Sequence, residues 1–485
     1  MSKEILINVE PQEKRVAILA DKILDEFYIE RPNEKTIVGN IYKGKIEAVI
    51  PSINGAFVDI GLSKKGFLYL SEIESAYETI DKLTEDNLLE YQPKTVKKGQ
   101  EVLVQVVKES FGTKGPRLSC QIGIAGRYLV LMPLDPGLGV SRRIENEEER
   151  KRLRLIMEQL ELPKEFGFIV RTAAMEKTKH ELLRDANFLI KLWRRIEKTI
   201  PRQRTPSLVY EEYDLTLRVI RDSFTEDVSR LIVDSKAEYY RILKFINSFM
   251  SPLRKKVELY KGSDLFGDYD VERQVAKIFE KKVYLKSKAY IVIEPTEGLV
   301  VIDVNTGGFK ERINQEEAAF KVNCEAAEEI AHQLRLRDLG GIIVIDFIDM
   351  EKEEHRRQVL RLLKEALKAD RAKYDVLGIS KFGLVEMTRE RVHNTVATIS
   401  YQDCPYCQGR GKVKSALTMA IQVIKQLRKF CANKRLRRVS VTVHPDVAAE
   451  LIKEPQGLKN IERTYHLRVD LISNSSFKVE DIAIT

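Results

Sequence analysis

The chain has 485 residues, and its 82 basic and 73 acidic side chains give a formal net charge of +9. A hydrophobic content of 43% and a charged content of 32% are typical of a soluble globular protein with about two to four domains. No run reaches the roughly 18 apolar residues of a membrane span, and the polar N-terminus does not resemble a signal peptide, so we expect a cytoplasmic protein. The odd, sparse set of five cysteines argues against a disulfide framework.

The first recognisable segment, residues 36–122, contains five short strand-like runs that are separated by glycine turns. This pattern predicts a small OB-type barrel, which an acidic, partly helical insert interrupts at about 71–98. Phe57 and Phe67 lie among lysines that include Lys114, and such a mixture suits base stacking and phosphate contacts. A place in the hydrophobic core is the alternative interpretation for each phenylalanine.

Residues 123–214 carry mixed helix and strand signals. Helical periodicity covers 147–160 and 181–200, and we expect the single tryptophan, Trp193, to lie in the core. Residues 215–280 also mix strand and helix, without recognisable chemistry.

An apolar strand that begins at Phe166 ends in Arg171 and Thr172. An arginine with an adjacent hydroxyl at a strand end suits the binding of a phosphate. Taken alone, such a pair of residues is more often an ordinary surface pair.

Two short apolar strands each carry an aspartate near their carboxyl end. The first is Gly298-Leu-Val-Val-Ile-Asp303-Val-Asn305, and the second is Gly341-Ile-Ile-Val-Ile-Asp346. A carboxylate inside such a run is costly to bury unless a bound cation compensates its charge. Alternation along the first strand places Asp303 and Asn305 on one face.

The segment between these strands predicts a helix from a cap at Asn314 to about Arg337. Strand, helix and strand form a βαβ unit with parallel strands, and functional residues collect at the carboxyl edge of such a sheet. Asp303 and Asp346 would therefore be two halves of one oxygen-ligand site for a hard cation, Mg²⁺ or Mn²⁺. The alternative is that both are ordinary strand-end or turn residues.

Cys404-Pro-Tyr-Cys407 is followed by glycines and has the spacing of a zinc-knuckle turn. The turn supplies two of four zinc ligands, and the same turn of a second chain would complete a shared site in a homodimer. A redox pair or a reduced turn without metal is the alternative, although Gly409 and Gly411 oppose the helix of a redox motif.

The remaining segments predict regular structure. A charged amphipathic helix is expected at 351–370. The basic tail from about 416 predicts a helix at 415–432 and strands at 439–443 and 467–472.

Three motifs carry a resemblance to a known family. The segments that begin at Ile302, Gly341 and Cys404 resemble signatures of the ribonuclease E/G family of endoribonucleases, and the resemblance extends along essentially the whole chain. The length is similar to that of the shorter, ribonuclease G branch. The implied fold is α/β and α+β multidomain, with an RNase H-like subdomain (1–35 with 215–280), an inserted OB-type S1 barrel (36–122), a 5′-sensor region (123–214), a DNase I-like catalytic subdomain (281–400), a zinc-link (401–415) and a small C-terminal domain (416–485).

The resemblance also implies roles for individual residues. Asp303 and Asp346 would hold a catalytic Mg²⁺ that Asn305 supports, and Cys404 and Cys407 would bind a structural Zn²⁺ shared between two chains. The positions that match RNA-contacting residues are Phe57, Phe67 and Lys114, and those that match the pocket for a 5′-monophosphate are Arg142, Arg171 and Thr172. The residue after Phe67 is often histidine in relatives and is Leu68 here, which affects one RNA contact.

We therefore expect a Mg²⁺-dependent endoribonuclease that cleaves single-stranded, A/U-rich RNA, prefers 5′-monophosphorylated ends, and acts in rRNA maturation and mRNA decay. Its partners would be single-stranded RNA, rRNA precursors, mRNA and a second copy of the chain joined through zinc, with further pairing into a tetramer left open. The alternative is a non-catalytic RNA-binding or scaffolding protein for ribosomal precursor RNA, which the barrel and the basic surface would serve equally well.

Overall fold

The computed structural model describes residues 2–32, 35–72, 97–110, 114–296, 298–308, 314–380, 382–390, 404–407, 409–432 and 436–485. These residues form two compact units, Met1–Ile399 and Ser400–Thr485. Among the described residues, no helix is both long enough and apolar enough to cross a membrane.

A five-stranded sheet joins the N-terminal residues to a later part of the chain. Its order is β15-β14-β1-β2-β3, with bounds Val257–Leu259, Val228–Val233, Lys3–Glu10, Glu13–Ala20 and Ile23–Glu30. Helices α4 (Leu215–Ser223) and α5 (Lys236–Phe249) pack on one face through Ile5 and Ile7. Helices α6 (Leu265–Asp268) and α7 (Val271–Ile278) pack with Leu6 on the other face, because successive residues of a strand point to opposite sides.

The predicted barrel is present and closed. Its strands are β4 (Ile41–Ile50), β5 (Gly55–Asp59), β6 (Gly66–Tyr69), β7 (Glu101–Lys108) and β8 (Arg117–Ser119). Strand β4 pairs with both β5 and β7, which closes the sheet, and β13 (Ser207–Tyr210) adds to β4 from the following region. Most of the insert expected at about 71–98 lies outside the described residues.

The region after the barrel is a small sheet with two helices. The sheet has the order β11-β12-β10-β9, with bounds Leu138–Val140, Gly167–Val170, Leu129–Met132 and Ile124–Ala125. Helices α2 (Glu147–Glu158) and α3 (Lys179–Thr199) confirm the helical periodicity. Trp193 on α3 is 2% exposed in the shared core, as expected.

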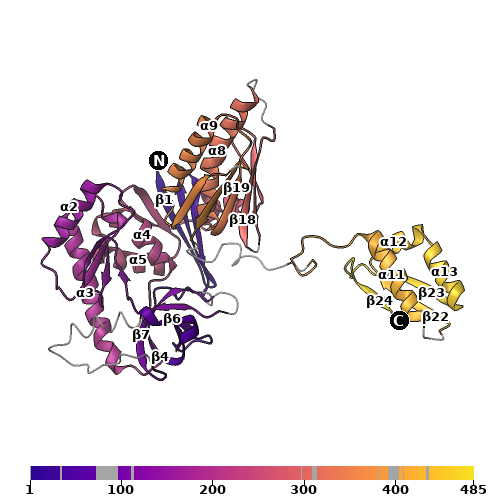
Figure 1. Ribbon diagram of the computed structural model, residues 1–485, viewed down its shortest axis with the longest axis horizontal. Coiled ribbons are helices and arrows are strands. Elements are labelled where there is room, and N and C mark those ends of the chain that lie inside the picture. Colours follow the sequence, from indigo (N-terminus) through magenta and orange to yellow (C-terminus); the bar gives the residue numbers. More distant parts are fainter. Residues whose placement is uncertain are drawn as a thin grey trace. The chain divides into compact units, whose positions relative to one another are not determined.

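A six-stranded sheet carries the two aspartate strands. Its order is β16-β17-β18-β19-β21-β20, with bounds Lys282–Tyr284, Tyr290–Pro295, Leu299–Asn305, Gly341–Asp346, Leu384–Arg389 and Tyr374–Ile379. Helices α8 (Gln315–Leu336) and α9 (Glu353–Leu367) pack together along this sheet (Figure 1) and share its core. Strands β18 and β19 are parallel and α8 joins them, which confirms the predicted βαβ unit. The Asn314 side chain caps α8 by accepting a hydrogen bond from the Glu317 amide.

The two aspartates do not lie inside the sheet's core, and the expectation of carboxylates inside a buried run was wrong. Ile302 and Ile345 are fully buried toward the helices, whereas the neighbouring Asp303 and Asp346 are exposed on the opposite face. The reason is the two-residue period of a strand, which separates the apolar residues from the carboxylates within one run.

The second unit is a small domain with one sheet. Strand β22 (Arg438–Val443) lies between β23 (Arg468–Ser473), which is parallel to it, and β24 (Ile482–Ile484), which is antiparallel. Helices α11 (Ala416–Cys431), α12 (Pro445–Lys453) and α13 (Gln456–Tyr465) complete its core. The helix and both strands expected in the tail are confirmed.

Candidate functional site

Asp303 and Asp346 are direct neighbours across two parallel strands. The register of β18 and β19 makes their Cα atoms partners, so the side chains leave the same face of the sheet at its carboxyl edge. Asn305 follows two residues later on that face, and its Nδ2 donates a hydrogen bond of 2.7 Å to Oδ2 of Asp303. The structure thus brings together the three residues that the sequence singled out.

The electrostatics of this edge favour a cation. Partial desolvation of the carboxyl group, followed by the nearby charges of Asp303 and Asp349, raises the pKa of Asp346 above its ordinary value. Two neighbouring carboxylates repel each other when both are ionised, and a divalent cation between them removes that cost.

The two carboxylates suit magnesium better than a metal that takes all of its ligands from the protein. Among the described residues, no group of three or more acidic, histidine or cysteine side chains is placed to hold a metal ion. Mg²⁺ commonly takes only one or two carboxylates and completes its shell with water and substrate phosphate oxygens. Asp303 and Asp346 provide those two carboxylates.

A second feature of the first unit is an arginine-rich cavity of about 750 Å³. Its wall includes seven arginines: Arg143, Arg171, Arg218, Arg221, Arg335, Arg371 and Arg389. Five carboxylates also line it, namely those of Glu26, Glu212, Asp222, Asp338 and Asp370. The excess of guanidinium groups suits an anionic ligand, and phosphate matches their fork geometry.

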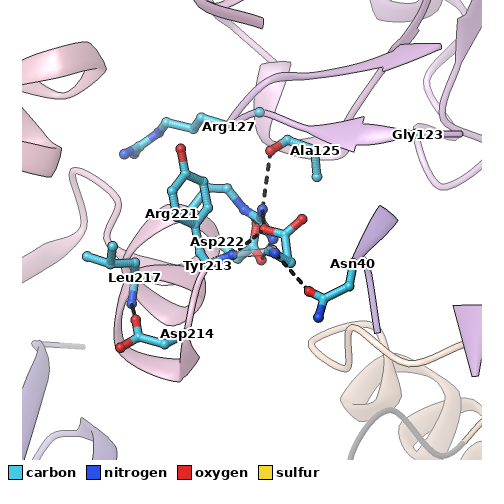
Figure 2. Close-up of polar contacts among 12 residues, drawn as sticks. Asn40, Gly123, Ala125, Arg127, Tyr213, Asp214, Leu217, Arg221 and Asp222 are labelled. Carbon is cyan, nitrogen blue, oxygen red and sulfur yellow. Dashed lines mark hydrogen bonds and ion pairs between the residues drawn. The ribbon is translucent and has the colours of Figure 1, made fainter. Parts of the chain in front are cut away.

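Arg171 is held in this wall by an ion pair that the sequence did not predict. Its Nη1 lies 2.7 Å from Oδ1 of Asp222 and donates to the carbonyl oxygen of Gly126. Asp222 also contacts Arg221, whose guanidinium reaches the carbonyl oxygen of Ala125 (Figure 2). Burial alone would raise the pKa of Asp222, but Arg221 and Arg171 lower it to about 2. Asp222 therefore stays ionised and fixes the orientation of Arg171.

A buried aspartate shapes the loop that Arg171 touches. Asp185 on α3 is 2% exposed and accepts hydrogen bonds from the amides of Arg127, Tyr128 and Leu129. Sequence reasoning missed Asp185 because it sits in an ordinary helical pattern.

The other two residues expected to bind a 5′-phosphate lie at the same sheet edge. Thr172 lines the cavity directly after β12. Val140 of β11 pairs in parallel with Val170 of β12, so Arg142 and Thr172 follow neighbouring strand ends. Arg142 is exposed and does not line the cavity, whereas the next residue, Arg143, does.

The barrel carries an aromatic cluster on its surface. The ring centroids of Phe57 and Phe67 are 5.9 Å apart, and those of Phe67 and Tyr69 are 5.0 Å apart. The Arg117 guanidinium lies 4.8 Å from the Tyr69 centroid. Both phenylalanines are half-buried and lie outside the barrel core, while Leu68 is fully buried within it. The Leu68 side chain therefore points away from the face that carries the rings.

Lys114 lies on the connection beside this cluster. It is exposed, and the amide of Phe67 donates to the carbonyl oxygen of Pro116, two residues further on. Gly115 allows this approach, because a Cβ there would lie 1.9 Å from the carbonyl oxygen of Lys65. The structure thus places all three predicted RNA-contacting residues in one region of the barrel.

The cysteine turn belongs to the second unit. The amides of Cys407 and Tyr406 are the main cause of a lowered pKa at the exposed thiol of Cys404, which favours the metal-binding thiolate form. The turn is anchored on a neighbouring segment, since Lys478 donates to the carbonyl oxygen of Pro405 and the Val479 amide donates to the Tyr406 hydroxyl.

Comparison with known families shows which family the chain belongs to. The family model described as "Ribonuclease E/G family" matches residues 123–392, and the model "S1 RNA binding domain" matches residues 35–121. The chain belongs to the ribonuclease E/G family. A further model, described as "RNase E/G, Thioredoxin-like domain", matches residues 403–485, which contain the cysteine turn and the small domain.

Several relatives within the family are similar to nearly the whole chain. Ribonuclease G of Haemophilus influenzae is 41% identical over 93% of the chain and 92% of its own length. Ribonuclease G of Escherichia coli K12 is 40% identical over 95% of each protein. Ribonuclease E of Haemophilus influenzae is 36% identical over 99% of the chain but only 52% of its own length.

Proposed function

We propose that the chain is a Mg²⁺-dependent endoribonuclease that cuts single-stranded, A/U-rich RNA and prefers a 5′-monophosphorylated end. The class of activity, an endoribonuclease and hence a hydrolase, follows from membership of the family. The observation that supports metal dependence is the in-register pair of Asp303 and Asp346, with Asn305 hydrogen-bonded to the first.

Each residue of this edge would have a distinct role. Asp303 and Asp346 would hold the Mg²⁺, which supplies an activated water and stabilises charge on the scissile phosphate. Asn305 would keep Asp303 in position through its amide hydrogen bond. Phosphodiester hydrolysis of this kind would leave a 5′-phosphate and a 3′-hydroxyl.

RNA would be held by two further surfaces. The half-buried rings of Phe57 and Phe67 would stack with bases, while Lys114 would contact the backbone. The cavity with Arg171 and Thr172, and Arg142 near its edge, would bind the 5′-monophosphate.

The assembly and setting belong to the same proposal. Cys404 and Cys407 would bind Zn²⁺ together with the same turn of a second chain, giving a homodimer that could pair further into a tetramer. Residues 1–35 with 215–280 would be RNase H-like, and 281–400 would be DNase I-like. The enzyme would act on rRNA precursors and mRNA in the cytoplasm.

A non-catalytic RNA-binding or scaffolding protein is the rival function. The barrel surface would serve it equally well, but paired carboxylates are repulsive toward a polyanion and serve no purpose in simple binding. Asp303 and Asp346 therefore favour the catalytic interpretation.

The experiment is incubation of the chain with a 5′-monophosphorylated A/U-rich oligonucleotide in Mg²⁺ or in chelator. The proposal predicts internal cleavage in Mg²⁺ alone, with 5′-phosphate products and slower cleavage of the 5′-hydroxyl oligonucleotide. Tight binding without cleavage in Mg²⁺ would support the scaffolding function instead.

A further inference from the structure

The sheet face that carries the aspartates also carries an aromatic and cationic cluster. Tyr290 of β17 pairs directly with Asn305 of β18, and Tyr284 of β16 pairs with Tyr290. In the adjacent row, Val292 pairs with both Asp303 and Lys282. Residues that oppose each other in a sheet share a face, so these side chains lie on one surface.

The three side chains of this cluster contact one another. The Lys282 Nζ lies 3.5 Å from the ring centroid of Tyr290 and 5.0 Å from that of Tyr284, and the two ring centroids are 6.1 Å apart. Tyr284 is nevertheless 67% exposed. The neighbouring Lys281 is paired with Glu294 at 3.1 Å, whereas no carboxylate forms an ion pair with Lys282 in the part of the chain that the structure describes.

The cluster is also tied to the turn that follows Asn305. Gly307 has a φ of +52°, and a Cβ there would lie 2.9 Å from the Tyr290 ring. The Gly308 amide donates to the carbonyl oxygen of Lys288, just before β17. Tyr290 thus packs against the turn beside the metal-binding edge, which leaves Tyr284 as the ring with a free surface.

We propose that Tyr284 and Lys282, backed by Tyr290, form a nucleotide subsite that holds one base and one phosphate of the single strand beside the scissile bond. The inference rests on the proposed endoribonuclease function and adds a specificity-determining contact to it. An exposed ring beside a lysine without a carboxylate partner is the combination that stacks a base and attracts its phosphate.

The spacing of the strands suits this occupant. Strands β16 and β18 are two interstrand spacings apart, so the Lys282 backbone is about 10 Å from that of Asp303. That separation lets a single strand of RNA lie across Tyr284 while a nearby phosphate of the same RNA reaches Asp303 and Asp346. The competing interpretation is a surface cluster that only stabilises the edge of the sheet.

The first test measures cleavage by the intact chain. Tyr284→Ala should lower kcat/KM for a 5′-monophosphorylated A/U-rich oligonucleotide by roughly 5- to 150-fold, which is the range for loss of one stacked base. Tyr284→Phe should retain near wild-type cleavage. Tyr240→Ala is the matched control, because Tyr240 is 59% exposed and contacts another tyrosine ring, that of Tyr239, edge to face, but lies on α5.

The second test locates the base that Tyr284 contacts. Abasic nucleotides are placed one at a time on each side of the cleavage site. One abasic position should slow the wild type and cause no further loss in Tyr284→Ala, as expected when both changes remove the same contact. Lys282→Gln should reduce the slope of log affinity against log salt by about 0.7, measured in chelator.

Two results would overturn the subsite. One is wild-type cleavage by Tyr284→Ala, and the other is an equal loss at every abasic position in both proteins. Either result would leave the proposed function intact if Mg²⁺-dependent cleavage persists. Failure of the proposed function is a separate outcome, namely the absence of cleavage by the wild type in Mg²⁺.

Discussion

Phe67 and Leu68 are adjacent on β6 but point to opposite sides, so replacing each by alanine should have opposite consequences. Phe67→Ala removes a half-buried ring that contacts Phe57 and Tyr69 on the barrel surface. Loss of one stacking ring costs about 1–3 kcal/mol of RNA binding, which is roughly a 5- to 150-fold increase in Kd. Because the ring is only half-buried, the loss of unfolding free energy should stay below the about 3–5 kcal/mol of a core phenylalanine.

Leu68→Ala is the matched control. Leu68 is fully buried in the barrel core, so this change should cost about 2–5 kcal/mol of unfolding free energy. The folded variant should bind RNA nearly as well as the wild type, since its side chain does not reach the aromatic face.

Gly55→Ala perturbs the same ring without removing it. An added Cβ at Gly55 would lie 2.3 Å from Phe67, so the ring must move. We expect weaker RNA binding although Phe67 is still present. The assays are fluorescence anisotropy with a labelled single-stranded oligonucleotide in chelator, and urea denaturation. Wild-type RNA affinity in Phe67→Ala, with a stability loss equal to that of Leu68→Ala, would refute the assignment and place the ring in the core.

Three further predictions concern other sites. Arg171→Ala should slow cleavage of 5′-monophosphorylated RNA toward the rate for 5′-hydroxyl RNA, because the guanidinium held by Asp222 would contact the phosphate; an unchanged ratio of the two rates would contradict this. Replacing Cys404 and Cys407 by serine should convert dimer to monomer and abolish binding of half a zinc per chain, as measured by light scattering and metal analysis; a metal-free dimer, or one zinc per wild-type chain, would count against the shared site. Burial alone would raise the pKa of Asp214, but hydrogen bonds from Arg241 and Lys14 lower it to about 2. A carboxyl group with a lowered pKa stabilises the folded state above the unfolded pKa of about 3.9, and this contribution is lost as the pH falls to about 2. Asp214→Asn should therefore cost about 2–3 kcal/mol of unfolding free energy near pH 7 and progressively less below about pH 4. Denaturation curves across this pH range are the check.

The sequence predicted those parts of the fold that depend on local patterns. The barrel, the βαβ unit and the tail elements follow from periodicity, caps and glycine turns, and the structure confirms them. The pairing of Asp303 with Asp346 was predictable because parallel strands joined by a helix align their carboxyl ends. The exposure of these two side chains was predictable from the alternation of side chains between the two faces of a strand, but their apolar neighbours suggested burial.

The contacts that depend on tertiary structure were not predictable. Asp222 and Arg171 are distant in sequence and meet only when α4 packs beside the β12 edge. Asp185 looks like any polar residue of a helix until the loop at Arg127 folds over it. Tyr284 has no motif around it, and only the register of β16 and β17 places it near Asn305.

The central claim is that Asp303 and Asp346 form one metal-dependent catalytic edge. The direct measurement is single-turnover cleavage of a 5′-monophosphorylated A/U-rich oligonucleotide in Mg²⁺ by Asp303→Asn and Asp346→Asn, with RNA affinity measured in parallel. Asp375→Asn is the control, because Asp375 is an exposed strand aspartate of the same sheet on β20. The account predicts that both catalytic variants lose cleavage and keep most of their RNA affinity, while the control cleaves normally. Near-normal turnover by either catalytic variant would contradict it.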